Sequence, residues 1–269
     1  MKSSRFPLRR YATFCARYDE RSGMKRPADF LVGRILHRDG LMLVIDKPAG
    51  LPVHAKPGTK KGEGGESLED YFDALRFGLP RAPALAHRLD RDTTGCLVLG
   101  RHPKALRKLH KLFLEGKIDK TYWAICRGVP EKLSGTIDAP LMKGTERKGW
   151  KMSVARAEED GAMSAVTTYR TLKSKDGVSF IEAKPKTGRT HQIRVHLASI
   201  GAPIIGDPLY GDLSDEDRAR PIMLHARRVI IPISKNKEPV VVEAPPPEWM
   251  RLMFRDCGFE EPATPKPEA

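Results

Sequence analysis

The order of the apolar segments is the feature that most constrains how this chain folds. Six short runs have the length and composition of buried strands, and three segments have the 3.6-residue spacing of amphipathic helices. The two kinds do not alternate strictly, as they would in repeated β-α-β units. We therefore expect an α+β fold with a mixed, largely antiparallel sheet and flanking helices. The strand-like runs are Leu41–Asp46, Cys96–Leu99, Lys120–Cys126, Ala165–Leu172, Val178–Lys184 and Met223–Ile231, the last regular element expected.

Local signals mark the ends of the first two expected helices. Ser67 and Asp70 have the spacing of a capping box at the start of the first, and Gly78 and Pro80 end it. The second runs from about Pro103 to Glu115 with an apolar stripe on one side. Its other side is basic and carries Lys104, Arg107, Lys108 and Lys111.

Charge is the unusual part of the composition. The 269 residues carry a formal net charge of +14, whereas 40% hydrophobic and 30% charged residues are ordinary for a soluble globular protein. A basic excess of this size indicates a polyanionic partner, most commonly nucleic acid. A membrane fits less well. No segment joins a basic face to a broad apolar one, and no apolar run approaches the roughly 20 residues of a membrane span.

The chain divides into three expected parts. Residues 31–257 should form one globular domain, residues 1–30 a basic, flexible arm, and the proline-rich residues 258–269 a disordered tail. An Arg-rich, acid-poor start is also compatible with an organelle transit peptide, and Met24 offers a later start. The cysteines form no CxxC pair, which argues against a metal site and favours a reducing, cytoplasmic location. They are Cys15, Cys96, Cys126 and Cys257.

The densest group of polar side chains lies between residues 86 and 95, in a turn between apolar segments. Three chemical interpretations are open. Asp90 and Asp92 could form a carboxylate pair, as in glycoside hydrolysis, or His87 could be a base, although no Ser or Cys nucleophile accompanies it. Alternatively, Asp90 is a lone carboxylate that an arginine keeps ionised. A plain turn with surface ion pairs explains this segment equally well on its own.

A basic cluster without acidic residues spans residues 184–196. A strand should lead through a glycine turn into a third helix capped by Thr190, a geometry that presents backbone N–H groups and cations to phosphates. His191 and Arg194 are three residues apart, so they should share one helix face. We expect His196 to be an ordinary packed histidine.

Together these runs resemble the motifs of the RluA-type pseudouridine synthase family. They occur in the family's order, cover roughly residues 40 to 235, and are far more specific together than singly. Thr94 stands where the family usually has Ser, which preserves the hydroxyl. The resembling runs are 47–54, 87–95, 120–124, 188–197 and, near the C-terminus, 201–207 with 224–226.

The resemblance implies a role for particular residues. Asp90 matches the catalytic aspartate, Arg194 the arginine that pairs with it, and Tyr122 the tyrosine that stacks on the target base. Arg88 matches a residue that contacts RNA around the flipped nucleotide. We expect the other substrate contacts from His87, Arg189, His191, Gln192, Ile193 and Leu224.

The resemblance also implies the pseudouridine synthase fold, with a curved sheet crossed by a central RNA-binding cleft. No metal or organic cofactor is implied, and the partner is RNA, either ribosomal or transfer RNA. Many members carry an N-terminal S4 domain of some sixty residues, whereas about forty residues precede the first motif, so we expect the short, monomeric architecture.

The expected reaction breaks the N1–C1′ bond of a uridine, turns the uracil and joins C5 to C1′. Its target must be unpaired or flipped out of a helix. Two other functions remain open. A hydrolytic glycosylase using Asp90 and Asp92 would release free uracil, and a non-catalytic RNA-binding protein would tolerate Asp90→Ala.

Overall fold

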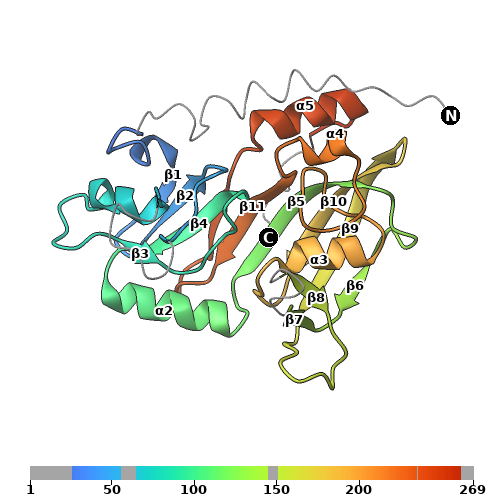
Figure 1. Cartoon of the computed structure of the whole chain (residues 1–269). Coiled ribbons are helices and arrows are strands. Elements are labelled where there is room, and N and C mark those ends of the chain that lie inside the picture. The colour runs from blue at the N-terminus through green and yellow to red at the C-terminus, as the bar shows by residue number, and fades with distance from the viewer. Residues whose placement is uncertain (1–25, 56–64, 145–150, 235, 262–269) are drawn as a thin grey trace.

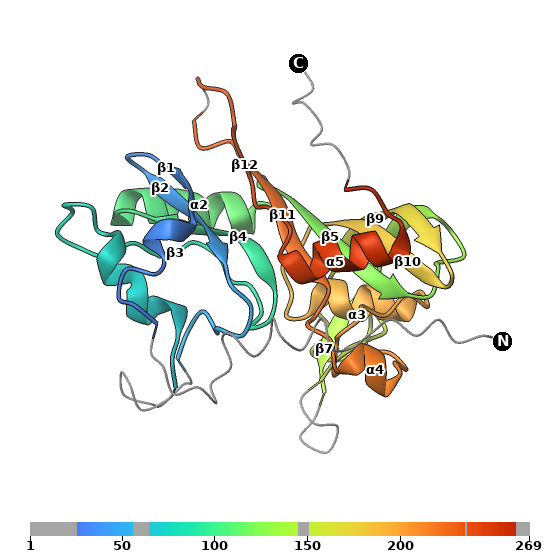
Figure 2. The same ribbon diagram turned by 90° about the horizontal axis from the view of Figure 1, so that it is seen from above.

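The computed structural model describes residues 26–55, 65–144, 151–234 and 236–261. Its main element is a ten-stranded sheet in the order β1-β2-β4-β11-β5-β10-β9-β6, with β3 added to β4 and β12 to β11. Every pairing in this sheet is antiparallel except the one between β4 and β11. In Figures 1 and 2, β1–β4 with α2 lie on one side of β11, and β5, β9 and β10 with α3 lie on the other. The expected α+β fold with a mixed, largely antiparallel sheet is confirmed.

The strands of the large sheet are β1 (Ile35–Arg38), β2 (Met42–Lys47), β3 (Ala84–Leu85), β4 (Thr94–Gly100), β5 (Asp119–Arg127), β6 (Ser134–Asp138), β9 (Val166–Lys175), β10 (Val178–Pro185), β11 (Leu224–Ile231) and β12 (Val240–Glu243). A separate pair is formed by β7 (Leu141–Lys143) and β8 (Met152–Val154). The helices are the 3-10 helices η2 (Val32–Arg34) and η3 (Leu68–Leu75) and the α-helices α2 (Pro103–Leu114), α3 (Gln192–Ser199), α4 (Asp215–Arg218) and α5 (Glu248–Cys257). Among the described residues, no helix has the length and apolar character to cross a membrane.

All six expected strands are present, with boundaries shifted by a few residues. The capping box at Ser67 and Asp70 is confirmed, but the segment it begins is the 3-10 helix η3, which ends at Leu75 rather than Gly78. The chain cannot continue as a helix there because Phe77 has a left-handed φ of 45°.

The expectation that regular structure closes at Ile231 is wrong, because β12 and α5 follow it. β12 has four residues, and the three prolines at 245–247 obscure the start of α5 in the sequence. α5 nevertheless has a buried apolar face. Phe254 contacts Trp123 and Phe180, with ring centroids 6.1 and 4.7 Å away.

Residues just outside both boundaries of the expected domain pack against it, including Phe30, the last residue of the expected arm. Phe30 packs edge-on against Tyr71 with ring centroids 4.5 Å apart. Phe259 is buried and stacks near Phe180, so the core extends past the expected boundary at residue 257. Residues 1–25 of the expected arm and residues 262–269 of the expected tail lie outside the described residues.

The β4–β11 contact joins the two halves of the sheet over two residue pairs, His225 with Thr94 and Ala226 with Gly95. Gly95 has a φ of +102°, and a Cβ on it would lie 2.3 Å from the Ala226 carbonyl oxygen. Only glycine allows this approach. Thr94 Oγ1 lies 2.8 Å from His225 Nδ1, and the other ring nitrogen lies 3.1 Å from the Ala244 carbonyl oxygen. A neutral ring therefore donates to Ala244 and accepts from the Thr94 hydroxyl.

Burial lowers the pKa of His225 to about 4, which makes the fold sensitive to acid. Between that value and the ordinary 6.5, the unfolded chain binds a proton at this residue that the folded chain does not. The free energy of unfolding should therefore fall as the pH drops below 6.5, approaching about 1.4 kcal/mol per pH unit from this residue.

His225→Asn should be less stable than wild type at neutral pH but should lose stability less steeply in this window. Urea unfolding of both proteins between about pH 7.5 and about pH 4.5 measures how the free energy of unfolding of each one changes with pH. Parallel curves for the two proteins would contradict the role of His225.

Candidate active site

The ten site residues predicted from the sequence all line one cavity of about 590 Å³, which we call the Asp90 cavity. This volume is within the roughly 300–1,000 Å³ range of ligand pockets. Its walls come from segments far apart in the sequence: residues 86–90 with Thr93, the end of α2, the start of β5, residues 185–194 and Leu224. Asp90 is the only carboxylate among the described residues that line it, whereas its cations are Arg88, Lys120, Lys186, Arg189 and Arg194.

The segment that carries Asp90 is held from behind by a buried lysine. Lys47 is fully buried, and its ammonium group donates to the carbonyl oxygens of Pro48, Arg91 and Thr93 at 2.8, 2.7 and 3.1 Å. Arg91 also donates to the Gly50 carbonyl oxygen at 3.0 Å. These bonds join the loop after β2 to the turn that follows Asp90.

Burial lowers the pKa of Lys47 to about 7, and the charges of Asp92 and Asp90 oppose that fall. Its ammonium has three N–H donors, and three backbone carbonyls surround it. We therefore assign Lys47 a positioning role for the Asp90 turn.

Arg194 lies between two carboxylates. Its Nε and Nη2 donate to the two oxygens of Asp207 at 2.7 and 2.8 Å, and its Nη1 donates to Asp90 Oδ2 at 3.4 Å. Asp207 is fully buried and also accepts the backbone N–H of Leu209 at 2.9 Å. Burial would lower the pKa of Arg194, but the hydrogen bonds and charge of Asp207 raise it. A fixed cation thus faces Asp90, which keeps 21% of its side chain exposed.

His191 contacts Tyr210 through one ring nitrogen and faces Asp90 with the other. Its Nδ1 lies 2.7 Å from the Tyr210 hydroxyl, and its Nε2 lies 3.9 Å from Asp90 Oδ2. The Tyr210 hydroxyl accepts the Met152 N–H at 3.2 Å, and its own proton is available to Nδ1 of the neutral tautomer that carries its proton on Nε2. Burial lowers the pKa of His191, and the charge of Asp90 opposes this.

The expected helix cap at Thr190 is wrong. α3 begins at Gln192, and its N-cap is His191 in the left-handed conformation at φ 54° and ψ 18°. The Gln192 side chain stabilises the turn before α3. Its amide oxygen accepts hydrogen bonds from the Thr187 hydroxyl at 2.7 Å and from the Arg189 N–H at 3.0 Å. It also donates to Val166 and Thr167, so protein partners already use both ends of its amide. His191 therefore lies outside the helix whose face it was expected to share with Arg194, yet both residues approach Asp90, at 3.9 and 3.4 Å.

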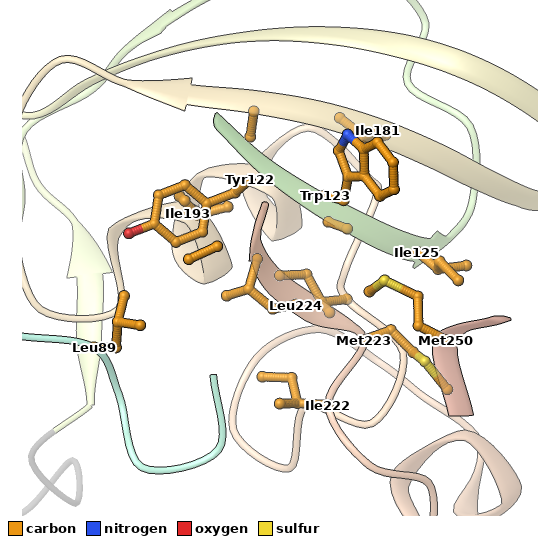
Figure 3. Close-up of a cluster of buried hydrophobic side chains, with 14 of the residues drawn as sticks. Leu89, Tyr122, Trp123, Ile125, Ile181, Ile193, Ile222, Met223, Leu224 and Met250 are labelled. Carbon is orange, nitrogen blue, oxygen red and sulfur yellow. The ribbon is translucent and has the colours of Figure 1, made fainter. Parts of the chain in front are cut away.

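Tyr122 forms an apolar side of the cavity with Leu89, Ile193 and Leu224, all of them at most 9% exposed. Figure 3 shows the Tyr122 ring beside Ile193, on the opposite side of β5 from Trp123. Burial raises the pKa of Tyr122, and the charge of Asp90 adds to this effect, so its hydroxyl stays protonated. The ring therefore offers a neutral surface on the same side of the sheet as Asp90.

Two other predicted site residues are partly engaged by the protein. His87 Nε2 accepts the Val98 N–H at 3.0 Å, and burial lowers the pKa of His87 to about 3, so it is a neutral wall rather than a base. Arg189 donates to the Ser164 carbonyl oxygen at 3.0 Å. Arg88 is exposed. The expectation that His196 is a packed histidine is confirmed, because it is buried and lies 2.9 Å from both Thr167 and Ala139.

Asp90 and Asp92 do not converge on one site. Asp92 lines a separate cavity of about 550 Å³, which we call the Asp92 cavity. The Thr93 N–H donates to the Asp90 carbonyl oxygen at 3.2 Å, and this turn places the two carboxylates on different sides of the segment. The geometry does not support a paired-carboxylate site.

Sequence reasoning gave no role to several residues that organise the cavity. Lys47, Lys120 and Asp207 lie inside the resembling runs, but nothing in the runs reveals their contacts. Burial lowers the pKa of Lys120 to about 8, and it donates to the Thr187 carbonyl oxygen at 3.3 Å. Tyr210 has no local signal beyond its type. Among the described residues, no group of three or more His, Cys, Asp or Glu is arranged to hold a metal ion.

Known proteins are similar to this chain in sequence and in architecture. The family described as RNA pseudouridylate synthase matches residues 41–199. An uncharacterized RNA pseudouridine synthase of Zymomonas mobilis is 45% identical over 231 residues, which cover 85% of this chain and 99% of that protein. Ribosomal large subunit pseudouridine synthase C of Haemophilus ducreyi is 34% identical over 84% of this chain and 70% of its own length.

The solved structure of human RNA pseudouridylate synthase domain containing 4 is similar with a TM-score of 0.73 and 30% identity, over 88% of this chain and 97% of that one. The chain therefore belongs to the RNA pseudouridylate synthase family and has the pseudouridine synthase fold. It is an isomerase that acts on RNA, and the resemblance to RluA-type enzymes is confirmed.

Lys47→Met tests the support of the Asp90 turn. The substitution leaves three carbonyls without their donor, each at a cost of about 1–3 kcal/mol, so the protein should be less stable. The turn should also lose its position, and kcat should fall by about tenfold or more while RNA affinity changes by less than about threefold. Steady-state kinetics and RNA binding, measured below the onset of unfolding, give both quantities. A wild-type kcat would remove Lys47 from this role.

Proposed function

We propose that Asp90 is the catalytic carboxylate of this pseudouridine synthase. The supporting observation is its position as the one carboxylate among the described residues of the cavity, with the Arg194 guanidinium 3.4 Å away. This contact orients the carboxylate in the cavity, where it can act on the sugar or the uracil ring. Because Asp207 holds Arg194 more tightly, the cation should stay in place when RNA binds.

The cavity suits a flipped uridine. We assign Tyr122 the surface on which the detached uracil stacks while it turns from an N1 to a C5 bond. Arg88, Arg189 and Lys186 would bind the phosphates on either side of the target, since phosphate contacts supply most of the affinity for RNA. The isomerisation has no net redox change and needs no energy source, so the proposal includes no cofactor or metal.

We propose ribosomal RNA as the substrate in preference to transfer RNA. The support is the 34% identity with ribosomal large subunit pseudouridine synthase C of Haemophilus ducreyi. We further propose a cytoplasmic location, because the described cysteines Cys96, Cys126 and Cys257 are buried and free, as in a reducing compartment. We also propose a monomer, because residues of one chain form the Asp90 cavity.

Asp90→Asn should abolish isomerisation while RNA affinity falls by less than about tenfold, or 1.4 kcal/mol. Asp92→Asn is the matched control, because it removes the same charge two residues away on the side of the Asp92 cavity. It should retain a rate within about tenfold of wild type. Single-turnover assays should follow both pseudouridine and free uracil. Turnover by Asp90→Asn, or release of uracil by the wild type, would overturn the proposal.

Deletion of the gene should remove pseudouridine from one or a few positions of large-subunit ribosomal RNA. Pseudouridine mapping across total RNA compares the deletion strain with strains complemented by the wild type or by Asp90→Asn. Only the wild type should restore the missing modifications. Loss confined to transfer RNA would contradict the substrate while leaving the activity in place.

A further inference from the structure

The end of α2 exposes an apolar side chain at the edge of the Asp90 cavity. Leu114 is 89% exposed, more than any other large hydrophobic side chain of the described residues, and it also lines the cavity. Leu133 is the next most exposed at 57%, but it does not line this cavity. One exposed leucine is ordinary on a protein surface. The position of Leu114 therefore matters more than its exposure.

Leu114 is held by a well-formed helix end. Gly116 takes the left-handed conformation at φ +65°, and the Lys117 N–H donates back to the Leu112 carbonyl oxygen at 2.9 Å. This is the hydrogen bond that closes a Schellman motif. α2 is in turn seated on β4, since a Cβ on Gly100 would lie 2.8 Å from the Leu106 Cα. Leu114 is therefore an exposed side chain on an ordered helix end.

Phe113 continues the apolar surface into the cavity. Its ring stacks on His87 with centroids 4.4 Å apart and planes at 27°. Burial lowers the pKa of His87 to about 3, so this stack is uncharged at neutral pH. Leu114, Phe113 and His87 together form what we call the α2 wall.

A second wall of the cavity is cationic. Lys186 and Arg189 belong to it, and Lys120, at the start of β5, donates to the Thr187 carbonyl oxygen at 3.3 Å. The two walls come close at Gly116, where an added Cβ would lie 3.5 Å from the Lys186 carbonyl oxygen. An RNA strand has the same asymmetry, with apolar base faces on one side and phosphates on the other.

We propose that Leu114, supported by Phe113, packs against an unpaired base next to the target uridine while the cationic wall binds the backbone. A flipped nucleotide leaves its neighbours without a stacking partner, and apolar side chains such as Leu and Phe fill such gaps in nucleic acids. The proposal rests on the assignment of the Asp90 cavity as the active site. It makes Leu114 a substrate contact outside the reacting atoms.

The test compares Leu114→Ser with Leu133→Ser, a matched change at an exposed leucine away from the cavity. The substrate is total RNA tritiated at C5 of uridine, from cells that lack the gene, and the readout is tritium released to water. Leu114→Ser should raise KM about tenfold, equivalent to 1.4 kcal/mol, and leave kcat within about twofold. Leu133→Ser should change neither. Leu114→Met keeps an apolar contact and should stay within about twofold of the wild-type KM.

A wild-type KM for Leu114→Ser, or equal losses for the Ser and Met variants, would overturn the proposal. A fall in kcat alone would overturn it too, because a contact with a neighbouring base acts on binding. Asp90→Asn, assayed in parallel, distinguishes a failure of the α2 wall proposal from a failure of the active-site assignment. If it is inactive and Leu114→Ser behaves as wild type, only the α2 wall is refuted. If it is active, the assignment of the cavity fails first.

Discussion

β4 and β11 touch over two residue pairs, and the position of the Asp90 cavity depends on this contact. Ala226 pairs with Gly95 on one side and with Tyr122 on the other, so one residue of β11 sets the positions of both β4 and β5. The approach is close enough that a Cβ on Gly95 would lie 2.3 Å from a carbonyl oxygen. Asp90 lies in the turn just before β4, which begins at Thr94. The register of the sheet therefore places the carboxylate opposite the tyrosine ring.

Buried charge keeps that arrangement rigid. Arg194 and Asp207 are mostly or fully buried, and burying two ions is costly unless their geometry and further hydrogen bonds compensate. The bidentate contact and the Leu209 N–H provide that compensation. The buried charge of Lys47 is compensated in a similar way, because its ammonium group donates to three backbone carbonyl oxygens and so holds the turn after Asp90. Asp90 is the one member of this network that stays partly open to solvent, with 21% of its side chain exposed.

One short segment separates two cavities of similar size. Asp90 lines one and Asp92 the other, so a single turn divides carboxylates that are close in sequence. The Asp90 cavity has an apolar α2 wall and a cationic wall made by the residues before α3. This asymmetry matches a nucleotide, whose base and phosphate have opposite preferences, and it gives a reason for the basic excess of the chain.

The sequence by itself determined the chemical groups, most of the secondary structure and the family. The strand-like runs, the capping box at Ser67 and the amphipathic α2 depend on neighbours in the chain, and local patterns are enough to predict them. The ten site residues could be selected because they lie in runs with family spacing. Only the tertiary structure decided which of them meet. Arg194 lies 104 residues from Asp90, and although its stronger partner Asp207 lies in a resembling run, nothing in that run marks it as the partner of Arg194. The left-handed His191, the saturated Gln192 and the divergence of Asp90 from Asp92 likewise come from strand register and burial, which no local pattern records.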